Sequence, residues 1–92
     1  MIQSFKCSDN EALYRGQRVA KFVNIETVAM RKLAMLNRAG SLNDLSIPPN
    51  NRLERLLGDR VGYHSIRIND QFRVCFRFAS GNAFDVEIVD YH

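Results

Sequence analysis

The last three residues of this 92-residue chain, Asp90, Tyr91 and His92, carry the side chains best suited to chemistry. They place a carboxylate, a phenol and an imidazole directly after an apolar-alternating run, Phe84 to Val89. Histidine is the side chain whose ordinary pKa lies nearest neutrality, so this group can exchange protons under physiological conditions. With arginines upstream, the tripeptide indicates metal-independent chemistry on a phosphodiester. The simpler alternative is a polar chain end without a function.

Positive charge is concentrated in the middle of the chain. The net charge is only +3, but residues 52–77 contain six arginines against Glu54, Asp59 and Asp70. The planar guanidinium suits phosphate, so an anionic partner is plausible. The alternative is an ordinary solvated face with salt bridges. The arginines are Arg52, Arg55, Arg60, Arg67, Arg73 and Arg77.

Length and composition restrict the class of protein. Ninety-two residues with 46% hydrophobic content predict one domain with a modest core. No stretch resembles a signal peptide or reaches the roughly 20 apolar residues that span a bilayer. Cys7 and Cys75 have no spacing typical of a disulfide framework or a zinc site. We therefore expect a cytoplasmic chain with reduced thiols, without a cofactor or a metal.

The first half of the chain predicts a strand and two helices. Residues 2–6 are a short strand candidate. Ser8 or Asp9 is the expected N-cap of a short helix that runs to about residues 14–15, where Gly16 ends it. An amphipathic helix is expected over residues 24–39, with Asn24 as its N-cap. Five apolar residues share one face of it: Ile25, Val28, Ala29, Leu33 and Leu36.

Residues 41–58 are rich in turn-forming types. Leu42, Leu45 and Ile47 are expected to attach this segment to the core. A single helical turn is possible over residues 52–57. The basic stretch of residues 16–23 has no pattern that decides its structure.

From residue 61 onward the hydrophobic period becomes two, which predicts three antiparallel strands in a meander. In the first hairpin, keeping apolar side chains on one face pairs Ile66 with Val74, Ile68 with Phe72, and Arg67 with Arg73. The same argument for the second hairpin pairs Phe78 with Phe84, Phe76 with Val86, and Arg77 with Asp85. The expected fold is α+β: a small antiparallel sheet, formed by the N-terminal strand and the meander, with two helices on one face.

The other face of this sheet is expected to be polar, and Ser65 lies on it. Arg67 and Arg73 would face each other there, an arrangement that is destabilising unless an anion relieves it. On the protein itself, Glu87 is the residue expected to offset them, and the alternative is that both arginines extend into water. His64 has the opposite parity and is expected to pack toward the core.

These groups match the needs of RNA cleavage by internal attack of the 2′-hydroxyl. A base must remove the hydroxyl proton, a cation must stabilise the charged phosphorus, and an acid must protonate the leaving 5′-oxygen. Asp90 or His92 fits the base, and Arg73 fits the cation. Tyr91 is expected near Gln71 and Arg73.

Several segments resemble HigB-type toxins of the RelE/ParE superfamily of type II toxin–antitoxin systems. The resemblance covers nearly the whole chain and is most specific in residues 51–54, 58–62, 65–76 and 86–92, with a further match at residues 31–33. It implies a RelE/ParE-like fold and a toxin that enters the ribosomal decoding site and cuts mRNA there.

The resemblance also implies roles and partners. The catalytic positions would be Arg73 at the scissile phosphate, Asp90, Tyr91 and His92 as the C-terminal group, and Gln71. RNA or ribosome binding falls to Arg52, Arg55, Arg60 and Arg67. The implied partners are the ribosome, mRNA and a HigA-like helix-turn-helix antitoxin. Operator DNA would be bound only through the antitoxin complex, and no membrane is involved.

Two positions depart from the pattern of some relatives, which carry a histidine where this chain has Glu54 and a lysine where it has Leu57. Glu54 is an alternative base but adds negative charge near the phosphate, whereas Leu57 cannot bind an anion. Two other readings of the chain remain. One is a toxin that binds and inhibits the ribosome or DNA gyrase without chemistry, and the other is a corepressor acting with its antitoxin.

Overall fold

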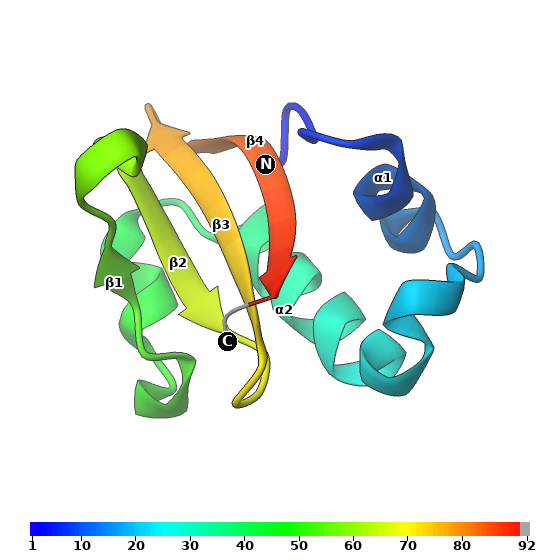
Figure 1. The fold of residues 1–92 in the computed structure, drawn as a ribbon. Helices are drawn as coiled ribbons and strands as arrows, with labels where there is room; N and C mark the ends of the chain where they lie inside the picture. Colours follow the sequence, from blue (N-terminus) through cyan, green and yellow to red (C-terminus); the bar gives the residue numbers. More distant parts are fainter. Residues whose placement is uncertain (91–92) are drawn as a thin grey trace.

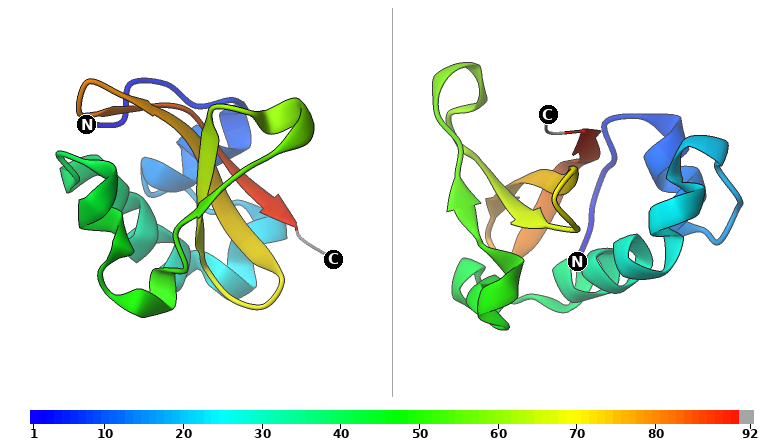
Figure 2. Two further views of the ribbon diagram at one scale, coloured as in Figure 1. Left: turned by 90° about the vertical axis from the view of Figure 1, so that its left-hand side faces the viewer. Right: turned by 60° about the horizontal axis from the view of Figure 1, so that its bottom comes forward.

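A four-stranded antiparallel sheet with helices against one face makes up residues 1–90, the part of the chain that this computed structural model describes (Figure 1). The strands lie in sequence order, β1-β2-β3-β4. Figure 2 shows α1, η1 and α2 forming one layer and the twisted sheet the other. No helix within these residues has the length and apolar character that a bilayer crossing requires. The elements are α1 (Ser8–Tyr14), the 3₁₀ helix η1 (Ala20–Ile25), α2 (Glu26–Arg38), the 3₁₀ helices η2 (Leu42–Ser46) and η3 (Pro49–Asn51), β1 (Glu54–Arg55), the 3₁₀ helix η4 (Gly58–Arg60), β2 (Tyr63–Arg67), β3 (Phe72–Ala79) and β4 (Asn82–Asp90).

Helix α2 covers the apolar face of the sheet, as its pattern predicted. Ile25, Ala29, Leu33 and Leu36 are buried against β3 and β4, and Val28 is partly buried. The predicted N-cap was wrong. Asn24 lies inside η1, which runs directly into α2, so Ile25 takes the cap position without a side-chain hydrogen bond.

Helix α1 ends as expected, at a left-handed Gly16 with φ of 88°. Its N-cap is Cys7 rather than Ser8 or Asp9, because the helix begins one residue earlier than the sequence indicated. Cys7 and Cys75 do not form a disulfide with each other, and Cys75 is buried.

The first hairpin has the predicted register. Ile66 pairs with Val74 and Arg67 with Arg73, and the amide of Ile68 donates to the carbonyl of Phe72 at 3.0 Å. Burial favours this register over one shifted by a single residue. The shift would turn Ile66 and Val74, both fully buried, toward the opposite face.

The second hairpin departs from prediction near its turn. Ser80 and Gly81 both have positive φ and form a two-residue turn that pairs Ala79 with Asn82. As a result Phe78 faces Ala83, and Arg77 faces Phe84 instead of Asp85. One extra residue in β4 between Phe84 and Glu87 then forms a bulge, which restores the predicted register from Cys75–Glu87 onward.

The edges of the sheet also differ from expectation. Residues 2–6 do not form a regular strand and make two isolated parallel bridges to β4, Ile2 with Ala83 and Phe5 with Val86. The predicted helical turn over residues 52–57 is wrong. Residues 54–55 form β1 instead, because their backbone pairs with β2 and that pairing outweighs local preference.

The connection before β1 is held by fewer apolar anchors than predicted. Leu45 is buried and Leu42 partly buried, but Ile47 is 70% exposed and does not contribute to the core.

Shortening one core side chain tests this packing. We expect Ile66→Val to lower the free energy of unfolding by about 0.5–1.5 kcal/mol, because Ile66 is fully buried between the sheet and the helices. Val61→Ala is the control, since Val61 is 72% exposed and its loss should stay within about 0.5 kcal/mol. Urea unfolding of both variants measures the difference, and equal values would contradict the assigned core.

Candidate functional site

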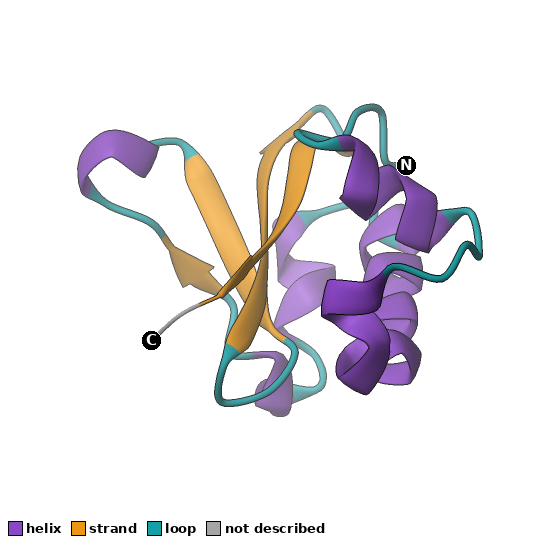
Figure 3. Ribbon diagram, turned by 45° about the vertical axis from the view of Figure 1, so that its right-hand side comes forward, coloured by secondary structure: helices purple, strands orange, loops and turns teal. Residues whose placement is uncertain are grey.

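A cationic groove is formed by residues of β1, β2, β3 and the segments next to them. Figure 3 shows these strands in orange, with α1, η1 and α2 on one side of the sheet. The volume of the groove is about 330 Å³. Three arginines and two carboxylates line it, so the lining keeps an excess positive charge suited to an anionic group. The lining residues are Arg52, Glu54, Arg67, Asn69, Asp70 and Arg73.

Arg73 is the most buried of the groove arginines, with 9% of its surface exposed. Its Nε donates to Ser65 Oγ at 2.8 Å, and its Nη2 donates to the backbone carbonyls of Arg52 and Ser65. Glu54 Oε1 lies 3.6 Å from the same Nη2. Nη1 has no hydrogen bond or ion pair with any residue from 1 to 90. The guanidinium is therefore fixed on one side and keeps donor capacity for a ligand.

Two local backbone features supply these acceptors. Arg52 follows η3 with φ of 47°, a left-handed conformation uncommon for a residue other than glycine, and its carbonyl accepts from Arg73. The β1–β2 pairing places Glu54 opposite Ser65, so the carboxylate and the hydroxyl both reach the guanidinium. The irregular stretch before β2 thus completes the wall around Arg73.

The β2–β3 turn forms the end of the groove. Asn69 Oδ1 accepts from the amides of Gln71 and Phe72 at 2.8 and 2.7 Å, a side-chain mimic of a backbone turn. Arg67 pairs with Asp70 across this turn. Arg67 and Arg73 do face each other as predicted, but their offsetting partners are Asp70 and Glu54.

The predicted role of Glu87 as the partner of these arginines was wrong. Glu87 Oε1 instead lies 3.3 Å from Arg60 Nη2. Asp85, two residues earlier on β4, pairs with Arg77 at 3.5 Å even though Asp85 and Arg77 are not opposite each other in the register. The bulge in β4 explains that contact, because it sets the direction of Asp85.

Gln71 and Asp90 form a second polar pair at the same end of the sheet. Gln71 Nε2 donates to Asp90 Oδ2 at 3.1 Å, and Asp90 lies opposite Phe72, next to Arg73 along β3. Tyr91 and His92, predicted as the other members of the C-terminal group, lie outside the described residues. The structure therefore brings Arg73, Gln71 and Asp90 to one end of the sheet.

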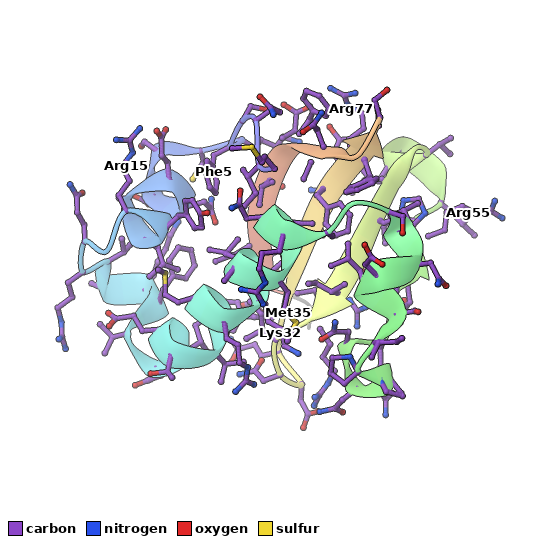
Figure 4. All side chains as sticks on the ribbon, turned by 180° about the vertical axis from the view of Figure 1, so that it is seen from behind. Phe5, Arg15, Lys32, Met35, Arg55 and Arg77 are labelled. Atoms are coloured by element: carbon purple, nitrogen blue, oxygen red, sulfur yellow. The ribbon has the colours of Figure 1, made fainter. Side chains whose placement is uncertain are left out.

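Two of the predicted binding arginines lie elsewhere. Arg55 points outward from the edge of β1, away from the groove (Figure 4), and Arg60 is engaged with Glu87. Asn69 and Asp70 also line the groove, although neither was predicted as a site residue. Ser65 was placed on the correct face without a role, and its position beside Arg73 in the register was the available signal. Among residues 1–90 no cluster of three or more His, Cys, Asp or Glu side chains could hold a metal ion.

His64 packs toward the core as predicted, with its ring stacked on Phe76 at 6.4 Å between centroids. Burial, and to a smaller extent the charge of Arg55, lower the pKa of His64 below its ordinary value. The folded chain therefore favours the neutral ring. The unfolded chain takes up the proton near the ordinary histidine pKa of about 6.5.

This difference predicts an acid-sensitive fold. As the pH falls below about 6.5, the unfolded state binds a proton that the folded state resists, so the free energy of unfolding should decrease until the lower folded pKa is reached. His64→Gln should reduce the pH dependence of stability in that range. Urea unfolding between about pH 5 and 8 measures, for both proteins, the slope of the free energy of unfolding against pH. Identical slopes would show that His64 has the same pKa in both states.

Comparisons with known proteins show the family to which this chain belongs. A family described as the RelE-like toxin of the type II toxin–antitoxin system HigB matches residues 5–92. Toxin HigB-1 of Vibrio cholerae serotype O1 is 37% identical over 87 residues, which are 92% of each chain. Endoribonuclease HigB of Proteus vulgaris is 42% identical over 41 residues, 45% of each chain.

A solved structure shares the fold. A chain of the heterotetrameric YoeB–YefM toxin–antitoxin complex from Staphylococcus aureus aligns with a TM-score of 0.58 at 17% identity, covering 100% of this chain and 98% of that chain. The fold thus defines a small α+β protein with a cationic groove at one end of its sheet. The chain belongs to the family of RelE-like toxins of the type II toxin–antitoxin system HigB.

Proposed function

We propose that this toxin is an endoribonuclease that cuts mRNA on the ribosome, with its reaction centre in the groove around Arg73. The observation that carries the proposal is the buried Arg73 guanidinium, which is fixed through Nε and Nη2, while Nη1 has no hydrogen bond to a residue from 1 to 90. The name of the Proteus vulgaris relative, an endoribonuclease, supports the same activity.

The proposed reaction is an internal transesterification. A base removes the proton of the 2′-hydroxyl, whose oxygen attacks the adjacent phosphorus, and the bond to the 5′-oxygen breaks as an acid protonates that oxygen. The products are a 2′,3′-cyclic phosphate and a 5′-hydroxyl. Arg73 stabilises the negative charge that develops on the phosphorus oxygens, so the mechanism requires no metal ion.

The proton-transfer roles fall to the residues at the end of β4. Asp90 or His92 is the base, and Tyr91 and His92 complete the C-terminal group. Gln71 would orient Asp90 through their hydrogen bond. Glu54 is the alternative base, although its carboxylate beside Arg73 competes with phosphate for the guanidinium. Arg52 and Arg67 would bind the RNA backbone next to the scissile bond, and Arg55 and Arg60 would contact the ribosome.

The same proposal includes the partners of the toxin. A few catalytic groups on so small a protein need the ribosome to hold the mRNA in the reactive geometry, so free RNA should be a poor substrate. A helix-turn-helix antitoxin of the HigA type would neutralise the toxin, and the pair would bind operator DNA and repress its own operon in the cytoplasm. The YoeB–YefM assembly supports an antitoxin partner by analogy of fold.

Induction of the chain alone in a bacterial host, followed by genome-wide mapping of mRNA 5′ ends, tests the activity. We expect new ends within translated codons and in a fixed reading frame, and those ends should carry a 5′-hydroxyl. Ends with a 5′-phosphate would contradict the internal attack. Growth arrest without new ends would replace the proposal with inhibition by binding.

A further inference from the structure

Lys32 is a buried cation that the proposed reaction does not use. It lies on α2 with 4% of its surface exposed. Burial first, and then the charges of Arg31 and Arg67, lower the pKa of its amine below the ordinary value. A charged side chain is costly in such a place unless it has a partner. The burial of Lys32 therefore requires a polar partner inside the protein.

The partner of Lys32 is Asn51, the last residue of η3. Lys32 Nζ donates to Asn51 Oδ1, and Asn51 is itself fully buried. Asn51 Nδ2 donates to the carbonyl of Leu45 at 3.1 Å and contacts Met35 Sδ at 3.7 Å. Lys32 and Met35 lie close together on α2, as Figure 4 shows from behind. These contacts tie the end of η3 to both α2 and η2.

The next residue after Asn51 is Arg52, whose left-handed backbone directs its carbonyl to Arg73 Nη2. Polar contacts and the peptide chain thus run without a break from Lys32 through Asn51 and Arg52 to the guanidinium. Within residues 48–52 only Asn51 is buried and the other four are exposed, so the Asn51 side chain is the one that fixes where this carbonyl lies.

We propose that Lys32 and Asn51 are positioning residues, which hold the Arg52 carbonyl in place and through it orient Arg73. The effect on cleavage rests on the proposed function, whereas the effect on the Arg73 side chain does not. Misplacing a catalytic group by about 1 Å can lower a rate about 100-fold, so a contact two residues removed can matter for turnover.

The experiment replaces Lys32 with methionine, which keeps the length and removes the donor. The matched control is Arg31→Met, an adjacent exposed residue of α2 that removes the same charge without touching Asn51. The first readout is the Nε–H resonance of Arg73 in a nitrogen–proton spectrum, assigned by its loss in Arg73→Ala. We expect Lys32→Met to shift this resonance and speed its exchange with water, and Arg31→Met to leave it unchanged.

The second readout is cleavage of ribosome-bound mRNA. We expect Lys32→Met to lower kcat about 10- to 100-fold with KM changed less than about twofold, because the site is misaligned but its charge is kept. In an Arg73→Ala background, adding Lys32→Met should cause no further loss. A further loss of equal size would mean that Lys32 acts independently of Arg73, and would overturn the proposal.

An unchanged Arg73 resonance in folded Lys32→Met would also overturn it. If that variant does not fold, the double variant Lys32→Met with Asn51→Leu replaces it. This variant removes both polar partners and leaves no buried Asn51 amide unsatisfied. An unchanged Arg73 resonance in the double variant would likewise overturn the proposal. A shifted resonance in a toxin whose cleavage does not depend on Arg73 would leave the positioning role intact and reject the proposed function.

Discussion

Arg73→Ala is expected to lower mRNA cleavage about 100- to 1,000-fold and to relieve the growth arrest caused by the toxin. The reason is that the guanidinium is anchored before substrate binds, by Ser65 and by the carbonyl of Arg52. A group held in this way stabilises developing charge without rearranging during the reaction. Cleavage of ribosome-bound mRNA by purified toxin measures the loss in kcat, and colony formation after induction measures the loss of toxicity.

Arg77→Ala is the matched control on the same strand and the same face. Arg77 pairs with Asp85 at 3.5 Å and lies over the ring of Phe84 at 4.8 Å, outside the groove. It should retain cleavage, although it removes the same charge from the chain. Because Arg73→Ala leaves the buried Ser65 hydroxyl without this donor, its unfolding must be measured alongside. A folded Arg73→Ala protein that cuts normally would remove Arg73 from the site.

Hydrophobic periodicity alone predicted one part of the sheet register and not another. The β2–β3 pairing was predictable because apolar and polar residues alternate cleanly on both strands, and only one register buries Ile66 with Val74. The start of β4 was not, because the turn at Ser80 and Gly81 fixes the pairing locally before the apolar pattern takes effect. The bulge then resolves the conflict between turn and pattern, leaving Phe84 stacked under Arg77.

Site residues were predictable where they lie in regular strands and not where they lie in irregular segments. Arg73 could be identified because its position in a regular strand follows from alternation. Two of its contacts could not, since they come from Arg52 in a left-handed turn and from Glu54 in a two-residue strand that only tertiary pairing creates. Lys32 was equally hidden, because a lysine in an amphipathic helix is ordinarily a solvated residue. Irregular segments have no hydrophobic periodicity, so their contacts cannot be predicted from the sequence pattern.

The C-terminal group gives the test that best separates chemistry from simple binding. We expect His92→Gln to lower cleavage about 100- to 10,000-fold, because glutamine keeps a hydrogen-bonding side chain but cannot transfer the proton that the reaction requires. Binding to the ribosome should persist, since the arginines of the groove are retained. Single-turnover cleavage and sedimentation with ribosomes measure the two properties separately.

A shortened chain that ends at Asp90 extends this test. Residues 1–90 form the core and the strand pairs that the structure describes, so we expect the shortened toxin to fold, bind ribosomes and fail to cut mRNA. Urea unfolding provides the control for the fold. A toxin that inhibits only by occupying its target predicts the reverse, namely full growth arrest without residues 91 and 92. That result would reject the reaction proposed for the groove and direct the search to translation or gyrase inhibition by binding.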